Sequence, residues 1–183
     1  MLKVRSIFIE LLLTAALATN ALAETPRKLS GMWILDAAAT EQSFSNTPRP
    51  PNAHKVAEWL GTVGGYMSLF SYQFIGETVV EDAYGGRGKR SEYRLVSNQG
   101  AELTYAQIKP TAGQGGNTLA VTILKNGRLR IVKSGLGETM GYLLWKRSPV
   151  TNEQVTRDDV MAASEIWIKS MRNIVKLLRD SPN

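Results

Sequence analysis

Few side chains in this sequence could carry acid–base or nucleophilic chemistry. His54 is the only histidine and there is no cysteine, which excludes a disulfide, a thiol nucleophile and a cysteine-based zinc site. A serine–histidine–aspartate triad would need His54, but this residue follows a proline-rich loop and no nucleophile-elbow motif is present. We therefore interpret His54 as a surface residue, and we predict a protein that is not an enzyme, with no catalytic residue, no metal and no cofactor.

Three carboxylates lie close together near the middle of the chain. Glu77 and Glu81 are four residues apart, which places them on one face of a strand, with Asp82 on the opposite face. Carboxylates in this arrangement could perform acid–base chemistry or bind a hard cation. The alternative, which we favour, is the solvated face of a strand.

The segment 85–91, Gly-Gly-Arg-Gly-Lys-Arg-Ser, resembles a phosphate-binding loop only superficially. In the motif G-x-x-x-x-G-K-[ST] the first glycine would fall at Ala83, and Arg90 takes the hydroxyl position. We interpret the segment as a glycine-rich hairpin flanked by basic residues, and a local anion site is the alternative.

A second basic cluster surrounds the hairpin signal Asn126-Gly127. Its members are Lys125, Arg128, Arg130 and Lys133. Such a cluster is usually the wet face of a sheet, and binding to anionic lipid or an acidic partner is the alternative.

The first 23 residues have the layout of a secretory signal peptide: a basic start, an apolar stretch over 7–18, and the small-x-small site Ala21-Leu22-Ala23. We predict cleavage after Ala23 and a periplasmic or secreted protein that is not a lipoprotein, because no cysteine can be acylated. An uncleaved anchor is the alternative. Cleavage would remove two of the 22 basic and one of the 16 acidic residues, leaving 20 and 15, a net charge of +5. This excess favours anionic membranes or acidic partners and does not indicate nucleic acid.

The predicted fold class is mainly β: an antiparallel meander barrel or half-barrel of about seven to eight strands, with a short helical insertion after the first strand. We expect residues 24–30 to form a flexible lead-in and residues 31–148 to form the barrel domain. Asp36 is the expected N-cap of the inserted helical turns. Residues 72–80 read as one strand bent at Gly76, and 140–147 as the last strand.

Residues 149–183 are predicted to hold a C-terminal amphipathic helix that starts at 156–159 and runs to about Arg179. The helix either packs on the barrel wall or projects from it. A projecting cationic helix containing tryptophan would suit a membrane interface or a partner protein. Its candidate interaction residues are Trp167, Lys169, Met171, Arg172 and Lys176.

The motif Gly31-x-Trp33-x-x-Asp36 at the first strand, and Trp145-Lys146-Arg147 at the last, resemble the lipocalin-like small secreted β-barrels of bacteria. The resemblance implies that Trp33 closes one end of the barrel and that a basic residue of the last strand, Arg147 or alternatively Lys146, packs across its indole ring in a cation–π contact. It also implies a small apolar cavity, without specifying a ligand.

The function predicted from these observations is a non-enzymatic binding module for an apolar or amphipathic small molecule. The alternative is an envelope protein-interaction module (an inhibitor, immunity protein or accessory subunit) that uses the C-terminal helix or the basic hairpin. A barrel packed solid, with no cavity, also stays open. The candidate lining residues are Trp33, Leu35, Tyr72, Phe74, Tyr93, Leu95, Tyr105, Leu119, Val121, Leu129 and Tyr142.

Overall fold

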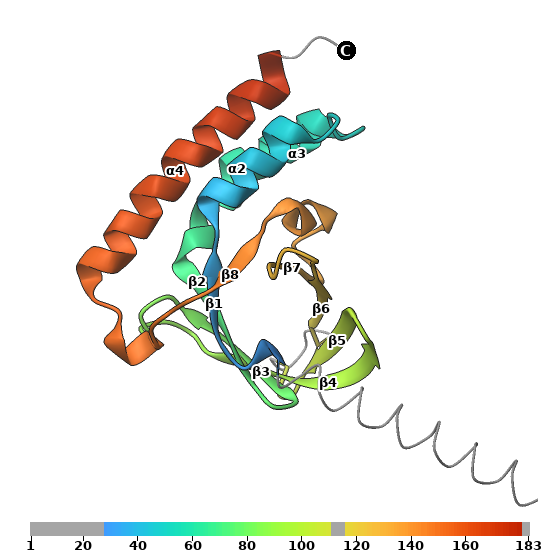
Figure 1. The fold of residues 1–183 in the computed structure, drawn as a ribbon, viewed down its shortest axis with the longest axis vertical. Coiled ribbons are helices and arrows are strands. Elements are labelled where there is room, and N and C mark those ends of the chain that lie inside the picture. Colours follow the sequence, from blue (N-terminus) through green and yellow to red (C-terminus); the bar gives the residue numbers. More distant parts are fainter. Residues whose placement is uncertain (1–27, 111–115, 181–183) are drawn as a thin grey trace, which may run out of the picture.

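The computed structural model describes residues 28–110 and 116–180. The predicted signal peptide lies outside the described residues, as does most of the lead-in. The described chain forms a closed barrel of eight antiparallel strands, each paired with the next and the last with the first (Figure 1). The strands are β1 (Gly31–Leu35), β2 (Phe70–Ile75), β3 (Thr78–Ala83), β4 (Ser91–Gln99), β5 (Glu102–Gln107), β6 (Thr118–Ile123), β7 (Leu129–Lys133) and β8 (Trp145–Arg147).

One strand boundary differs from the prediction. Residues 72–80 are not a single bent strand, because Gly76 adopts φ +56° and reverses the chain between β2 and β3. The two strands then pair as a hairpin, with Phe74 opposite Val79. A left-handed conformation of this kind is readily accessible to glycine. Because the turn at Gly76 divides this segment into β2 and β3, the barrel has eight strands.

The last strand is also shorter than predicted. Glu138–Tyr142 forms a 3₁₀ turn, η2, and only Trp145–Arg147 pairs with β1. Tyr142 is therefore not on a barrel strand, and its ring packs against Phe44 at a centroid distance of 5.6 Å.

Helices form a layer beside the barrel (Figure 1). α2 (Ala37–Asn46), α3 (Ala53–Thr62) and the 3₁₀ helix η1 (Gly64–Leu69) connect β1 to β2, and a short 3₁₀ turn, η3 (Asn152–Gln154), precedes α4 (Arg157–Asp180). Asp36 caps α2 by accepting a hydrogen bond from the Ala39 amide at 3.2 Å, as predicted. Among the described residues, no helix is both long enough and apolar enough to cross a membrane.

The C-terminal helix neither projects nor lies mainly on the barrel wall. α4 packs chiefly against α2, α3 and η1, and it buries Trp167, Ile174 and Leu178 there. The Trp167 indole N–H donates to the Gly64 carbonyl at 2.7 Å. The helices inserted after β1 already present an apolar surface, so the stripe of α4 is buried against them.

Two polar contacts hold the ring of Trp33 in β1. Its indole N–H donates to the Leu29 carbonyl at 2.8 Å, and the Arg147 guanidinium lies 5.4 Å from the ring centroid. Leu29 itself is buried, with 2% of its surface exposed. The residues just before β1 are thus packed against the barrel at Trp33.

Candidate functional site

Strand alternation places one acidic side chain inside the barrel. In β3, Val79 and Glu81 share the inward face, and Glu81 is paired in register with Tyr72 of β2. Only 4% of the Glu81 surface is exposed. The interpretation of Glu77 and Glu81 as a solvated strand face is therefore wrong for Glu81: Glu77 lies in the exposed turn after Gly76, whereas Glu81 lies within the barrel strand.

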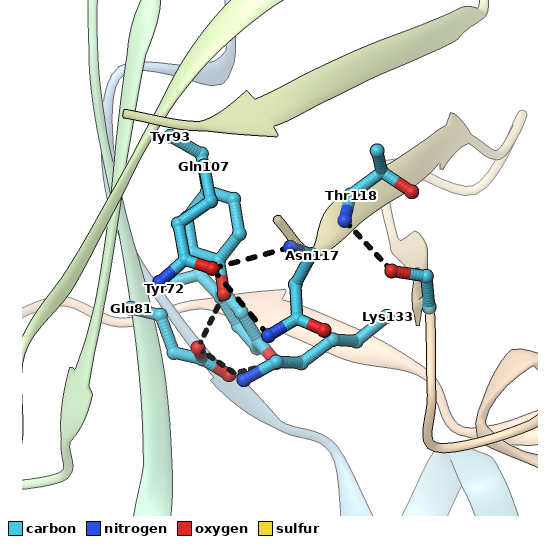
Figure 2. A network of polar contacts seen from close by, with 8 residues as sticks. Tyr72, Glu81, Tyr93, Gln107, Asn117, Thr118 and Lys133 are labelled. Carbon is cyan, nitrogen blue, oxygen red and sulfur yellow. Dashed lines mark hydrogen bonds and ion pairs between the residues drawn. The ribbon is translucent and has the colours of Figure 1, made fainter. Parts of the chain in front are cut away.

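Three donors converge on the Glu81 carboxylate (Figure 2). One oxygen accepts from the Tyr72 hydroxyl at 3.2 Å. The other accepts from the Tyr93 hydroxyl at 2.9 Å and from the Lys133 ammonium at 2.7 Å. The negative charge is thus neutralised by Lys133 and further stabilised by two phenol groups, which is the requirement for burying a carboxylate.

The partners of Lys133 and Arg128 show that the predicted basic cluster around the β6–β7 hairpin is not one surface. Lys133 points into the barrel toward Glu81, and Arg128 forms an ion pair with the buried Asp36 at 2.9 Å. Of this group, only Lys125 and Arg130 are exposed. The pleat of β7 explains the difference, because Lys133 shares its face with the buried Leu129 and Ile131.

A second set of polar contacts borders the ion pair at the barrel end that carries the β5–β6 connection (Figure 2). The Gln107 side-chain oxygen accepts from the Asn117 backbone amide at 3.2 Å and from its side-chain amide at 3.4 Å. The Thr118 amide donates to the Ser134 hydroxyl at 2.8 Å. These bonds connect the ends of β5, β6 and β7 around Lys133, whose side chain is 18% exposed. Lys133 is therefore partly accessible to solvent.

Burial perturbs the tyrosines of the interior. Desolvation raises the pKa of Tyr72 and of Tyr93 well above the ordinary value, and the nearby Glu81 charge adds to this effect. Burial also raises the pKa of Tyr105 to about 12, with a contribution from Glu77. All three phenols are thus protonated at neutral pH and act as hydrogen-bond donors.

Among the described residues of the barrel interior, two buried donors have no hydrogen-bond partner. The Tyr105 hydroxyl and the Trp145 indole N–H each lack a hydrogen bond, although both residues are fully buried. An unpaired buried polar group costs about 1–3 kcal/mol. Such groups call for a water molecule or a ligand that satisfies them.

Most predicted lining residues meet in one interior cluster. Their rings pack edge to face: Trp33 on Phe74 at 6.4 Å, Phe74 on Tyr105 at 5.8 Å, and Tyr72 on Trp145 at 4.9 Å between centroids. Leu95 is only partly buried, and Tyr142 belongs to η2. The buried members of the predicted set are Trp33, Leu35, Tyr72, Phe74, Tyr93, Tyr105, Leu119, Val121 and Leu129.

Sequence reasoning missed Glu81 and Lys133 as partners, although a signal was present. Each is the one charged residue on an inward face whose other members are apolar: Val79 for Glu81, and Leu129 and Ile131 for Lys133. Two opposite charges on inward faces of one barrel would have suggested an interior ion pair. His54 is exposed on α3. In the described part of the chain, no three histidine or acidic side chains lie together in a way that could hold a metal ion.

The fold and the site together define a closed antiparallel barrel of eight described strands with an ion pair in its interior. No family model matches the sequence, and no match was found among curated proteins or among solved structures.

Proposed function

We propose that this protein is a non-enzymatic binding module whose barrel holds an amphipathic small molecule, with the polar group of the ligand at Lys133. The observation that carries the proposal is the Glu81–Lys133 pair, buried among tyrosines in an otherwise apolar interior. The closed barrel, together with the Trp33 and Arg147 end, also supports a lipocalin-like module. The signal peptide predicted for residues 1–23 would make it an exported protein.

The energetics of the pair support a role beyond stability. Replacing a buried ion pair by apolar residues of similar volume is often neutral or stabilising by about 1–4 kcal/mol. An interior built for stability alone would therefore have apolar residues at positions 81 and 133. A pair of this kind, whose lysine stays partly exposed, is better explained by recognition of a polar group.

The donors that remain available define the polar group of the ligand. Lys133 has three N–H donors and gives one to Glu81, and Tyr105 and Trp145 each have an unpaired donor in the interior. These donors call for an acceptor. Because Glu81 neutralises Lys133 and would repel a second carboxylate, the favoured ligand is uncharged and has a carbonyl, ester or ether oxygen.

Native mass spectrometry of the gently purified full-length protein tests the proposal. We expect a small-molecule adduct that is released on denaturation, and saturable binding of Nile red, an uncharged dye with a carbonyl group, detected by its fluorescence. Lys133→Met should remove both, whereas Lys125→Met, an exposed lysine of the neighbouring hairpin, should preserve both. Nile red binding that is the same in the two variants would refute recognition at Lys133.

A second candidate function, attachment to an anionic membrane surface, rests on the outer face of α4. Lys169, Arg172, Lys176 and Arg179 are all exposed, and no acidic residue occurs between Ile166 and Arg179. Three of these cations border a groove of about 380 Å³ whose apolar lining includes Met171 and Val175. Asp180 also lines this groove. Glu41 lies beside the helix, and its pKa is lowered by hydrogen bonds from Ser170 and Asn173 and by the charge of Lys169.

Trp167 is excluded from this surface, because it is fully buried against the helix layer. The interaction face predicted from sequence therefore lacks its aromatic residue. Its exposed cations are Lys169, Arg172 and Lys176. Each cation contributes about 1 kcal/mol at an anionic bilayer. The variant Lys169→Gln/Arg172→Gln/Lys176→Gln should weaken co-sedimentation with phosphatidylglycerol vesicles by about a hundredfold. Equal binding to phosphatidylcholine vesicles would refute this candidate.

A further inference from the structure

A half-enclosed cleft lies where the start of α4 meets the barrel, apart from the interior site. It has a volume of about 220 Å³ and is lined mostly by apolar side chains, including Ala83, Val155 and Val160, with Tyr84 also on the wall. A cavity of about 150 Å³ in a protein interior accommodates benzene. The cleft is therefore large enough for one aromatic ring with a small substituent.

The walls of the cleft are held together by hydrogen bonds through Asn152. Its side-chain oxygen accepts from the Gly85 amide at 3.2 Å and from the hydroxyl of the buried Ser71 at 3.2 Å. A β-carbon on Gly85 would lie 3.4 Å from Val160 and 3.7 Å from Val155. The loop after β3 thus lies directly on the segment that leads into α4, and β2 anchors both.

Two arginines from different elements line this apolar cleft. Arg87 comes from the β3–β4 loop and Arg157 from the first turn of α4. Across residues 28–110 and 116–180, three side-chain ion pairs are present and neither arginine takes part in one. Two acids follow Arg157 directly. The exposed Asp158 takes part in none of these ion pairs, and Asp159 accepts hydrogen bonds from the Thr156 amide and hydroxyl at 2.8 and 2.6 Å.

We propose that this cleft is a second binding site, which takes a small aromatic carboxylate. The ring occupies the apolar lining and the carboxylate is bound by Arg87 and Arg157. Guanidinium groups bind carboxylates through paired, charge-assisted hydrogen bonds. A ring with one carboxylate matches both the volume of the cleft and the two cations beside it. The inference is independent of the interior site, because none of the cleft residues belongs to the Glu81 network.

Titration of the isotope-labelled full chain with sodium benzoate, followed by amide chemical shifts in NMR, tests the site. We expect saturable shifts at Gly85 and Val160, and at least tenfold weaker binding of benzamide, the uncharged isostere. Sodium sulfate, an anion without a ring, should cause no saturable shift at these amides. Equal affinity for benzoate and benzamide, or shifts confined to other parts of the chain, would overturn the proposal.

Substitutions distinguish the cleft from nonspecific attraction of anions. Arg87→Gln/Arg157→Gln should weaken benzoate binding at least tenfold and leave Nile red binding unchanged. Arg90→Gln is the matched control, because Arg90 lies in the same loop but faces Glu92 at 3.4 Å and does not line the cleft. Val160→Phe should abolish benzoate binding by filling the cleft, with folding checked by circular dichroism. Unchanged affinity in the folded Arg87→Gln/Arg157→Gln variant would contradict the proposed recognition.

Discussion

The Glu81–Lys133 pair leads to a quantitative prediction for stability. The charged atoms are 2.7 Å apart, and the side chains of Glu81 and Lys133 are 5% and 18% exposed. With an effective dielectric constant of about 20, two unit charges at this distance attract by roughly 6 kcal/mol. Solvent that reaches the partly exposed Lys133 screens part of this attraction. A coupling free energy of about 3 kcal/mol should remain.

A double-mutant cycle measures that coupling. Lys133→Met leaves a buried carboxylate without its cation, and Glu81→Gln leaves a buried cation without its anion, so each should lower the free energy of unfolding by about 3 kcal/mol. The double variant should also lose about 3 kcal/mol instead of about 6, because no unpaired charge remains. Urea unfolding followed by tryptophan fluorescence gives the four free energies.

An exposed ion pair provides the control for this cycle. Arg90 and Glu92 are 3.4 Å apart with side chains 56% and 51% exposed, so their coupling should stay below about 1 kcal/mol. If the Glu81–Lys133 coupling were equally small, or if the two single substitutions were additive, the description of a desolvated interior pair would be wrong.

Three further predictions concern the tyrosines, the helix layer and the turn at Gly76. Because the pKa values of Tyr72, Tyr93 and Tyr105 are raised in the folded protein, their stabilising contribution is complete below about pH 10 and is lost as pH rises beyond it, by at most about 1.4 kcal/mol per pH unit for each residue. Absorbance at alkaline pH should show these phenols ionising only on unfolding, and ionisation near pH 10 in the native state would contradict their burial. Trp167→Ala should cost about 3–5 kcal/mol in thermal unfolding, and a loss below 1 kcal/mol would mean that α4 is not packed on α3. Gly76→Ala should lower the free energy of unfolding by about 1–2 kcal/mol, because φ is +56° there although no atom would meet the new β-carbon. Gly61→Ala in α3 is the control, since it also meets open space but has no positive φ. It should raise the free energy of unfolding by about 0.5–1 kcal/mol in the same assay.

Local patterns in the sequence predicted much of the architecture. Alternation of apolar and polar residues identified the strands around Leu119 and Leu129, Asn126-Gly127 marked their hairpin, and Asp36 marked the start of α2. These signals are short-range, because pleat, turn and cap each depend on residues within a few positions of one another. The amphipathic stripe of α4 was equally readable, since it depends only on helical spacing.

Only the tertiary structure decided which charges are paired and which surfaces are free. Glu81 and Lys133 are 52 positions apart, and closure of the barrel brings β3 and β7 to face each other across its interior. The sequence predicted Trp167 as an interaction residue, because an apolar helical stripe does not specify which surface it packs against. In the structure this stripe packs against α3 and η1. Sequence spacing determines on which face of a helix or strand a side chain lies. The partner across that face depends on long-range packing. For this reason Glu81, which was predicted to be solvated, lies at the centre of the interior site.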